Sequence, residues 1–324
     1  MAEWLVEEGI GESRAVRLEG DAIAEARLTW PEDRAAGTVA DARLVSRRRG
    51  DSRGIAEFPD GALTLVDRLP PDASEGASIR VQVMRPALAE AGRNKLARAR
   101  PTSDPPGPAP SLAETLAREG HQVRRVRRFA GEEWESLLAD ALAREIAFTG
   151  GSLLLSPTPA MTLIDIDGEL DPRALALAAC APIARALRIL DIGGSIGIDF
   201  PTLGEKAHRR EVDATLDRAL AGWPHERTAM NGFGFVQLVS RLSRPSILHR
   251  ATFQRAATAA RLLLRRAEGL HGPGCIELIA HPALEAQLRP AWLEDLRRRT
   301  GCEHRFRFDP GLAIEAPHAQ LVAR

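Results

Sequence analysis

The stretch that decides the fold runs from Met161 to Phe200 and reads MTLIDIDGELDPRALALAACAPIARALRILDIGGSIGIDF. A short apolar run that ends in Asp-Ile-Asp is followed by a long segment with helical apolar spacing. A second short apolar run, Ser195 to Phe200, completes the stretch. This periodicity predicts a strand, a helix and a strand. Such a unit is nearly always a right-handed crossover between parallel strands, so the stretch predicts an α/β fold.

Three acids, Asp165, Asp167 and Asp199, fall near the carboxyl ends of the two predicted strands. In an open α/β sheet this edge is where ligands usually bind. A buried, unpaired carboxylate is strongly disfavoured, so each acid needs a cation, a proton or a donor. Converging carboxylate oxygens are the ligands that Mg²⁺ and Mn²⁺ prefer. The alternative is that each acid caps a turn or a helix, as Asp171-Pro172 indicates for the helix that follows.

The same stretch resembles the catalytic core of the ribonuclease E/G family. In that family T-x-I-D-(I/V)-N-x-G precedes a helix, the motif A-R-x-L-R-x-x-x-x-G-G and a strand that ends in I-D-F. The matching segments here are Thr162–Gly168, Ala184–Gly194 and Ile198–Phe200. Later family positions are matched by His208, Arg210, Phe233, Gly234, Arg241, Pro245 and Ser246.

The resemblance implies that Asp165 and Asp199 are catalytic and bind Mg²⁺, with Mn²⁺ as a possible substitute. Asp167 stands where the family has Asn, so it is expected to be a third ligand or to orient the attacking water. The predicted function is a Mg²⁺-dependent endoribonuclease that cleaves single-stranded RNA and leaves a 5′ phosphate and a 3′ hydroxyl. One alternative is a catalytically weak or inactive RNA-binding scaffold on the same fold. A third reading, a deoxyribonuclease or phosphatase, is less favoured.

The predicted fold class is α/β (α+β, multidomain). The resemblance implies an OB-type barrel inserted in a split ribonuclease-H-like domain, then a deoxyribonuclease-I-like α/β catalytic core and a small α/β C-terminal domain. A Pro-rich stretch, 101–111, is the clearest boundary. The expected units are 1–35 and 123–150 for the split domain, 36–98 for the barrel, 99–122 for the linker, 151–250 for the catalytic core and 251–324 for the C-terminal domain.

Short apolar runs separated by turn signals predict the N-terminal half. Residues 1–30 predict two antiparallel strands around a Gly20-Asp21 turn. Four apolar runs predict strands of the barrel: Thr38–Val45, Gly54–Phe58, Leu63–Val66 and Ile79–Met84. A fifth strand is expected, but the sequence does not place it. Phe58 is the only surface aromatic expected there, so the barrel is predicted to contact RNA weakly, through the phosphate backbone. Helices are predicted at Glu133–Phe148, 203–221, Thr252–Gly269 and Trp292–Arg299, and late strands at Cys275–Ala280 and Glu303–Phe308.

The charges balance, since Lys and Arg number 44 and Asp and Glu also number 44. The whole molecule is therefore not a strong polyanion binder, and RNA must be held by local basic surfaces. The candidate RNA-binding residues are Arg47, Arg48, Arg124, Arg125, Arg127, Arg128, His208, Arg210, Arg241 and Arg244. The cluster from Arg124 to Arg128 fits a phosphate-contacting strand beside the active site and a solvated edge strand equally well.

The three cysteines show no metal or redox spacing. The family's Cys-Pro-x-Cys zinc link and its Arg-Thr sensor of the RNA 5′ monophosphate are not found where they are expected. No zinc is therefore predicted, and a homo-oligomer, if it forms, would not be zinc-linked. No apolar run is long enough to span a membrane. Single-stranded RNA is the expected partner, no membrane is expected to be bound, and the expected location is cytoplasmic.

Overall fold

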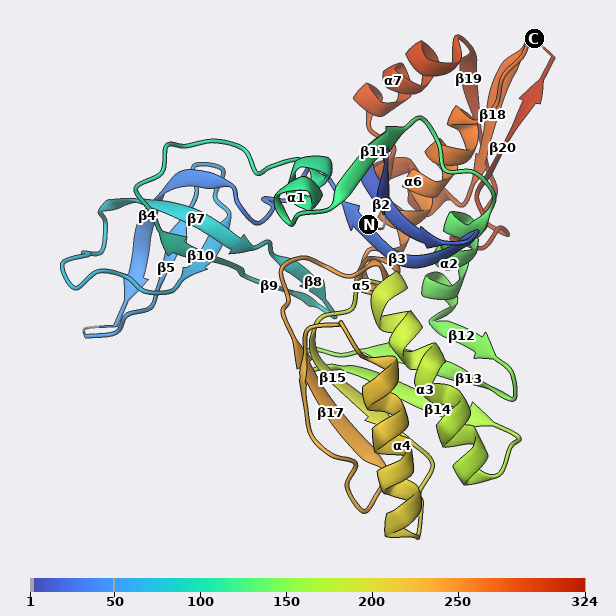
Figure 1. Cartoon of the computed structure of the whole chain (residues 1–324). Coiled ribbons are helices and arrows are strands. Elements are labelled where there is room, and N and C mark those ends of the chain that lie inside the picture. Colours follow the sequence, from blue (N-terminus) through green and yellow to red (C-terminus); the bar gives the residue numbers. More distant parts are fainter. Residues whose placement is uncertain (1–2, 49, 324) are drawn as a thin grey trace.

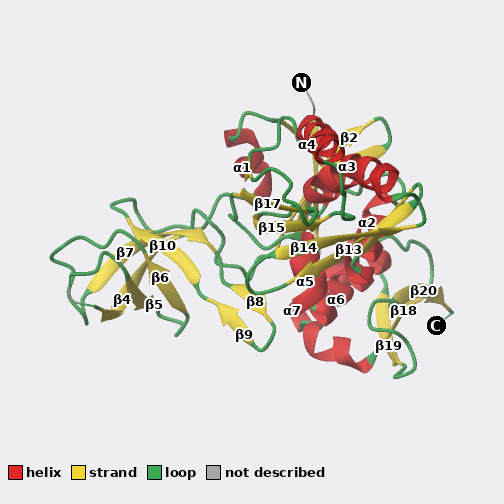
Figure 2. Ribbon diagram, turned by 90° about the horizontal axis from the view of Figure 1, so that it is seen from below, coloured by secondary structure: helices red, strands yellow, loops and turns green. Residues whose placement is uncertain are grey.

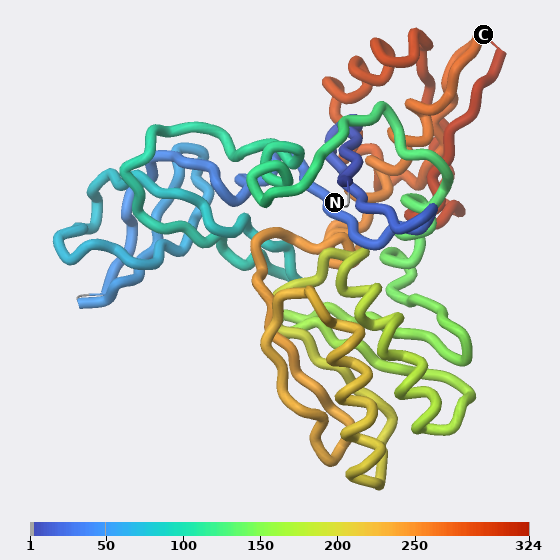
Figure 3. The backbone as a smooth tube through the Cα atoms, viewed as in Figure 1, coloured from blue at the N-terminus to red at the C-terminus, as the bar shows by residue number. Residues whose placement is uncertain are grey.

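The chain forms four larger β-structures, one two-stranded hairpin and the helices that connect them in this computed structural model, which describes residues 3–48 and 50–323. A small barrel projects to one side, while a six-stranded sheet and a three-stranded sheet lie at opposite ends of the molecule (Figure 1). The backbone trace shows a four-stranded sheet near the centre, where these parts meet (Figure 3). A mixed α/β architecture with a closed five-stranded barrel is consistent with the predicted OB-type barrel.

The central sheet pairs the start of the chain with a segment that follows the barrel. Its strands, in spatial order, are β11 (Gln122–Val126), β1 (Glu3–Gly9), β2 (Glu12–Glu19) and β3 (Ala22–Thr29). The predicted hairpin corresponds to β2 and β3, and Gly20 adopts a φ of 62° in the turn between them. β1 was not predicted, and it pairs in parallel with β11. Helix α1 (Leu112–Arg118), which begins with a capping box at Ser111, packs on one face of this sheet.

The barrel closes with the strand that the sequence did not place. Its spatial order is β10 (Ala97–Pro101), β6 (Leu63–Val66), β5 (Gly54–Glu57), β4 (Val39–Arg47) and β7 (Ser78–Arg85). A two-stranded hairpin, β8 (Leu88–Glu90) and β9 (Arg93–Lys95), leads into β10. The prediction of Phe58 as a surface aromatic is wrong. Its ring is 2% exposed, lies in the barrel core and is covered by the Arg34 guanidinium at 3.8 Å.

The six-stranded sheet contains the stretch from Met161 to Phe200. Its spatial order is β12 (Glu145–Phe148), β13 (Gly151–Pro157), β14 (Thr162–Gly168), β15 (Gly194–Asp199), β17 (Phe235–Ser240) and β16 (Glu226–Arg227). β14 and β15 are parallel, as predicted, and the other neighbours are antiparallel. Helices α3 (Pro172–Ile189) and α4 (Lys206–Ala219) lie on one face of the sheet (Figure 2).

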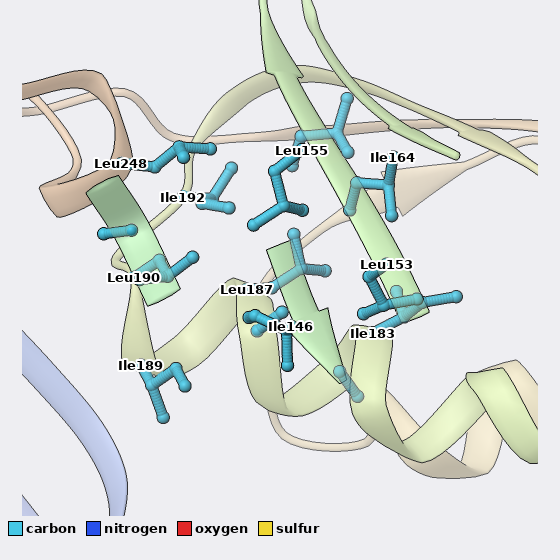
Figure 4. Close-up of a cluster of buried hydrophobic side chains, with 14 of the residues drawn as sticks. Ile146, Leu153, Leu155, Ile164, Ile183, Leu187, Ile189, Leu190, Ile192 and Leu248 are labelled. Carbon is cyan, nitrogen blue, oxygen red and sulfur yellow. The ribbon is translucent and has the colours of Figure 1, made fainter. Parts of the chain in front are cut away.

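Apolar side chains fill the space between the sheet and α3. Leu153, Leu155 and Ile164 point from the strands toward Ile183 and Leu187 of the helix, and all are essentially inaccessible to solvent (Figure 4). Burial of each such side chain stabilises the folded state by roughly 1.5–3 kcal/mol relative to leaving it exposed. The predicted N-cap of α3 is confirmed, because the Asp171 carboxylate accepts hydrogen bonds from the first-turn backbone amides. One face of the sheet is thus committed to the core.

The remaining helices pack in two places. Helices α2 (Glu133–Ala143) and α5 (Ile247–Phe253) belong to the core that they share with the six-stranded sheet. A small mixed sheet packs against the other helices; the elements of this part are α6 (Arg255–Glu268), β18 (Cys275–Ala280), a 3-10 helix (Pro282–Gln287), α7 (Pro290–Thr300), β19 (Glu303–Phe308) and β20 (His318–Val322). The single helix predicted at Thr252–Gly269 is two helices that meet at Gln254, where φ and ψ are −126° and 40°. The Ser246 side chain caps α5 and sets its earlier start. Within the described residues, none of the helices has the length and apolarity needed to cross a membrane.

Candidate active site

Asp165 and Asp199 are direct partners in the parallel pair β14–β15. Neighbouring strands lie about 4.8 Å apart, and paired residues project to the same side of the sheet. Ile164 and Ile198, which precede the two acids, point into the core beneath α3 and are fully buried. Strand alternation therefore turns both carboxylates toward the opposite, exposed face. Two acids that are far apart in the chain become immediate neighbours.

The positions of the two acids follow the prediction in part. We expected both near the carboxyl ends of their strands: Asp199 is the last residue of β15, as expected, whereas Asp165 lies in the middle of β14. The strand continues through Gly168 because it pairs with β13 along its whole length. The acids consequently lie on an open face of the sheet.

Asp167 lies on the same face, two residues farther along β14, opposite Ser152 of β13. Its Oδ1 accepts a hydrogen bond from the backbone amide of Gly168 at 2.9 Å. Across residues 3–48 and 50–323, the structure contains no group of three or more His, Cys, Asp or Glu side chains placed to hold a metal. The arrangement is a carboxylate pair, Asp165 and Asp199, with Asp167 farther along the same face.

Within the described residues, no cation neutralises either acid of the pair. Asp165 Oδ1 accepts a hydrogen bond from the Ile166 amide at 2.9 Å. Of the ion pairs formed by the described part of the chain, none involves Asp165 or Asp199. Adjacent like charges on paired strands destabilise a sheet unless something offsets them. Two exposed carboxylates in this arrangement fit a hard divalent cation such as Mg²⁺.

Apolar side chains cover the sheet beside the acids. Gly197 leaves no room for a Cβ atom, which would lie 2.5 Å from the Phe235 ring and 2.9 Å from Leu163 Cδ2. Phe235 is the direct partner of Asp199 on β17. On the other side, Leu154 is paired with Asp165 and is 36% exposed. The carboxylates therefore lie within a largely apolar surface.

Phe233 matches a family position in the sequence, but it was not among the predicted site residues. Its side chain is 82% exposed, although it is large and apolar. The Asn231 side chain holds the turn by accepting hydrogen bonds from the amides of Phe233 and Phe235 at 2.9 and 3.0 Å. The carbonyl of Gly234, a residue with a φ of 92°, accepts a hydrogen bond from the amide of Phe200, directly after Asp199. The turn that carries this exposed ring thus lies next to the end of β15, where Asp199 is located; the signal in the sequence was Asn-Gly-Phe-Gly.

The basic cluster on β11 is not beside these acids. β11 is the edge strand of the central sheet, whereas β14 and β15 lie in the six-stranded sheet (Figure 1). Arg124 pairs with Glu3 at 2.9 Å, and Arg128 donates to the Arg265 carbonyl at 2.7 Å. Arg125 and Arg127 are exposed. The edge-strand alternative therefore describes this cluster better than a site beside the acids.

Of the other predicted RNA-binding residues, some already bind groups of the protein and others are exposed. Arg244 is ion-paired with Asp191, and the Arg47 guanidinium donates to backbone carbonyls of the neighbouring loop. These contacts are structural and leave little capacity for RNA. His208 lies 3.5 Å from Glu205 within the first turns of α4. The exposed candidates are Arg48, Arg210 and Arg241.

Comparisons with known proteins point to the segment that contains the acid pair. Residues 114–241 match the model of the ribonuclease E/G family. Ribonuclease G of Escherichia coli (strain K12) is 32% identical over 151 residues, which cover 43% of this chain and 31% of that protein. Ribonuclease E of Haemophilus influenzae is 30% identical over 148 residues, or 39% of this chain and 15% of that protein.

The match is thus partial on both sides, since it spans about a third of the length of the ribonuclease G relatives. It nevertheless includes β14, β15 and both aspartates. It also extends through the turn that carries Phe233. The resemblance seen in the sequence is confirmed: residues 114–241 match the ribonuclease E/G family, and ribonucleases G and E are similar to this chain over the same segment.

Proposed function

We propose that this chain is a metal-dependent endoribonuclease that cleaves single-stranded RNA. The observation that carries the proposal is the direct pairing of Asp165 with Asp199 on an exposed sheet face, without a counter-ion in the described residues. The match of the surrounding segment to the family supports RNA as the substrate. A role in RNA processing or decay follows from the same family.

Asp165 and Asp199 would hold the Mg²⁺ ion, for which Mn²⁺ is a chemically similar substitute. When bound, such an ion lowers the pKa of a coordinated water and offsets the charge that develops on the phosphoryl oxygens. Asp167, one strand repeat away on the same face, would accept a hydrogen bond from the attacking water and orient it.

The architecture proposed for the rest of the molecule follows the family. The central sheet would be the ribonuclease-H-like part, split by an OB-type barrel, and the six-stranded sheet would be the deoxyribonuclease-I-like catalytic core. The return of the chain from the barrel to β11, beside β1, supports a split domain. Residues after α5 would form the small C-terminal domain.

Removal of divalent metal is expected to abolish cleavage. Without a cation, the two carboxylates repel both each other and an approaching phosphate. The measurement is the fragmentation of a 5′-labelled single-stranded RNA with Mg²⁺, with Mn²⁺ and with excess chelator. Cleavage with either metal and none with chelator is expected. Intact RNA in all three reactions would contradict the enzyme proposal and favour an RNA-binding scaffold.

Replacement of Phe233 by Ala is expected to weaken substrate binding by about tenfold, because stacking of a base on an aromatic ring contributes roughly 1–3 kcal/mol. Phe233→Trp retains a stacking surface and should behave like the wild type. The measurement is KM and kcat for a short single-stranded RNA. Phe306→Ala, which removes a 38%-exposed ring on β19, is the matched control. Equal KM values for F233A and F306A would exclude a role for Phe233 in binding.

A further inference from the structure

A basic groove of about 500 Å³ lies between the barrel and the end of β17. Barrel residues line one side, and Ser240, Arg241 and Leu242 line the other. Asp67 is the one carboxylate among the described residues that line it. The cations that line it are Arg68, Arg85, Lys95, Arg98, Arg100 and Arg241. Such an imbalance concentrates anions in the groove.

Arg85 is the unusual member of this group, because it is only 5% exposed. Its Nη2 donates to the Leu96 carbonyl at 2.5 Å, but its buried Nη1 has no hydrogen-bond partner among the described residues. Burial lowers the pKa of the guanidinium, and the like charge of Arg98 lowers it further. A buried guanidinium normally has a carboxylate partner. An anion that enters the groove would accept a hydrogen bond from Arg85 Nη1 and offset its buried charge.

The charges of Arg98 and Arg100 are only partly compensated by neighbouring side chains. Arg98 is half exposed and shares the Asp67 carboxylate with Arg53. Arg100 donates to the neutral Gln82 side chain at 2.9 Å. These contacts hold both guanidinium groups along β10 while leaving net positive charge. A phosphate group accepts several such hydrogen bonds at once.

Strand β17 connects this groove to the acid pair. It begins at Phe235, opposite Asp199, and ends at Ser240, which lines the groove. Six extended residues span on the order of 17 Å. The cations are spread over several strands, which suits a polyanion better than one small ion.

We propose that this groove binds phosphate groups of the RNA substrate, with Arg85, Arg98 and Arg100 as the central contacts. The inference rests on the proposed function, because it identifies where the same RNA is held away from the acid pair. It adds residues on β7 and β10 to those predicted from the sequence. It also gives the exposed Arg241 a location next to them.

The test is RNA binding by the double variant Arg98→Gln/Arg100→Gln, measured by fluorescence anisotropy in chelator, where no cleavage occurs. Kd is expected to rise at least tenfold. The slope of log Kd against log salt should fall by about 0.7 for each phosphate that the variant no longer neutralises. The charge-matched control is Arg297→Gln/Arg298→Gln on α7, away from the barrel (Figure 1). Its Kd should equal that of the wild type.

Two RNA forms, with a 5′ hydroxyl and with a 5′ monophosphate, distinguish internal from terminal phosphates. Equal reductions in affinity for both forms mean that internal phosphodiesters occupy the groove, and a reduction confined to the second form means a terminal phosphate. Arg85→Lys, checked first for an unchanged thermal midpoint, should bind RNA more weakly because one ammonium cannot reproduce the hydrogen bonds of the guanidinium. Wild-type affinity and salt slope in the β10 double variant would overturn the proposal.

Failure of this inference is distinguishable from failure of the nuclease proposal. If the β10 variant binds normally while the wild type cleaves RNA with Mg²⁺, the groove assignment is wrong and the enzyme assignment stands. If the wild type never cleaves but the β10 variant binds RNA more weakly than the wild type, the groove assignment stands alone.

Discussion

Asp199→Asn is expected to lower kcat for RNA cleavage by roughly 10²–10³-fold or more, the range seen when one electrostatic contact to a transition state is removed. The substitution keeps the size of the side chain but removes one of the two charges that would hold the metal. Asp165→Asn should have the same effect, because the two residues are partners in the strand register. The measurement is single-turnover cleavage of labelled RNA with saturating Mg²⁺.

The structure offers a matched control for this experiment. Glu145 lies on the same sheet face in the same cross-strand row, two strands from Asp165, because it pairs with Leu154. Glu145→Gln removes one charge of the same sign and should leave kcat unchanged. Cleavage by Asp199→Asn at the wild-type rate would show that the acid pair is not the catalytic site.

Stability gives the Asp199 variant a second readout. Without metal, the two neighbouring carboxylates repel each other, so Asn at either position should leave the protein as stable as the wild type or slightly more stable. RNA binding in chelator should also be retained. A variant that is inactive because it is misfolded would instead show a lower unfolding midpoint.

Glu7→Ala is expected to destabilise the protein by about 3–5 kcal/mol, the cost of removing one partner from a buried charge network. Glu7 is 2% exposed and its Oε1 lies 3.3 Å from both Arg14 and Arg265. Its Oε2 accepts a hydrogen bond from the Phe129 amide at 2.8 Å. The network joins β1, β2, the segment after β11 and α6 at the centre of the molecule. Removing the Glu7 carboxylate leaves two guanidinium groups buried with less compensation.

The measurement is the free energy of unfolding from urea titration. Glu19→Ala is the control, because the Glu19 side chain is 72% exposed and its ion pair with Arg17 should contribute at most about 1 kcal/mol. The metal-dependent activity of Glu7→Ala should decrease only in proportion to the decrease in its folded fraction. A Glu7→Ala change no larger than the Glu19→Ala change would mean that the network is solvated or readily rearranged.

Local sequence was sufficient for the elements around the acids. Two short apolar runs identified β14 and β15, the helical period and the Asp171-Pro172 cap identified α3, and the strand–helix–strand order predicted parallel strands. The acids became candidates because carboxylates follow apolar residues near the ends of these strands, and the family resemblance then selected two of them. By contrast, β1 was missed because its acidic residues conceal the alternation of Trp4 and Val6, and Phe58 was placed on the surface because burial is not a local property.

The sequence by itself determined the strand–helix–strand unit, because apolar periodicity and capping depend on neighbouring residues. It also offered three acids on the two strands, of which the family resemblance selected Asp165 and Asp199 as candidates. Only the tertiary structure decided that Asp165 and Asp199 share one register, that β11 returns to β1, and that Arg85 is buried. The physical reason is that register and burial depend on packing between segments distant in the chain. The sequence lists the charged residues but does not show which of them form ion pairs. Ion pairing depends on which side chains the fold places close together.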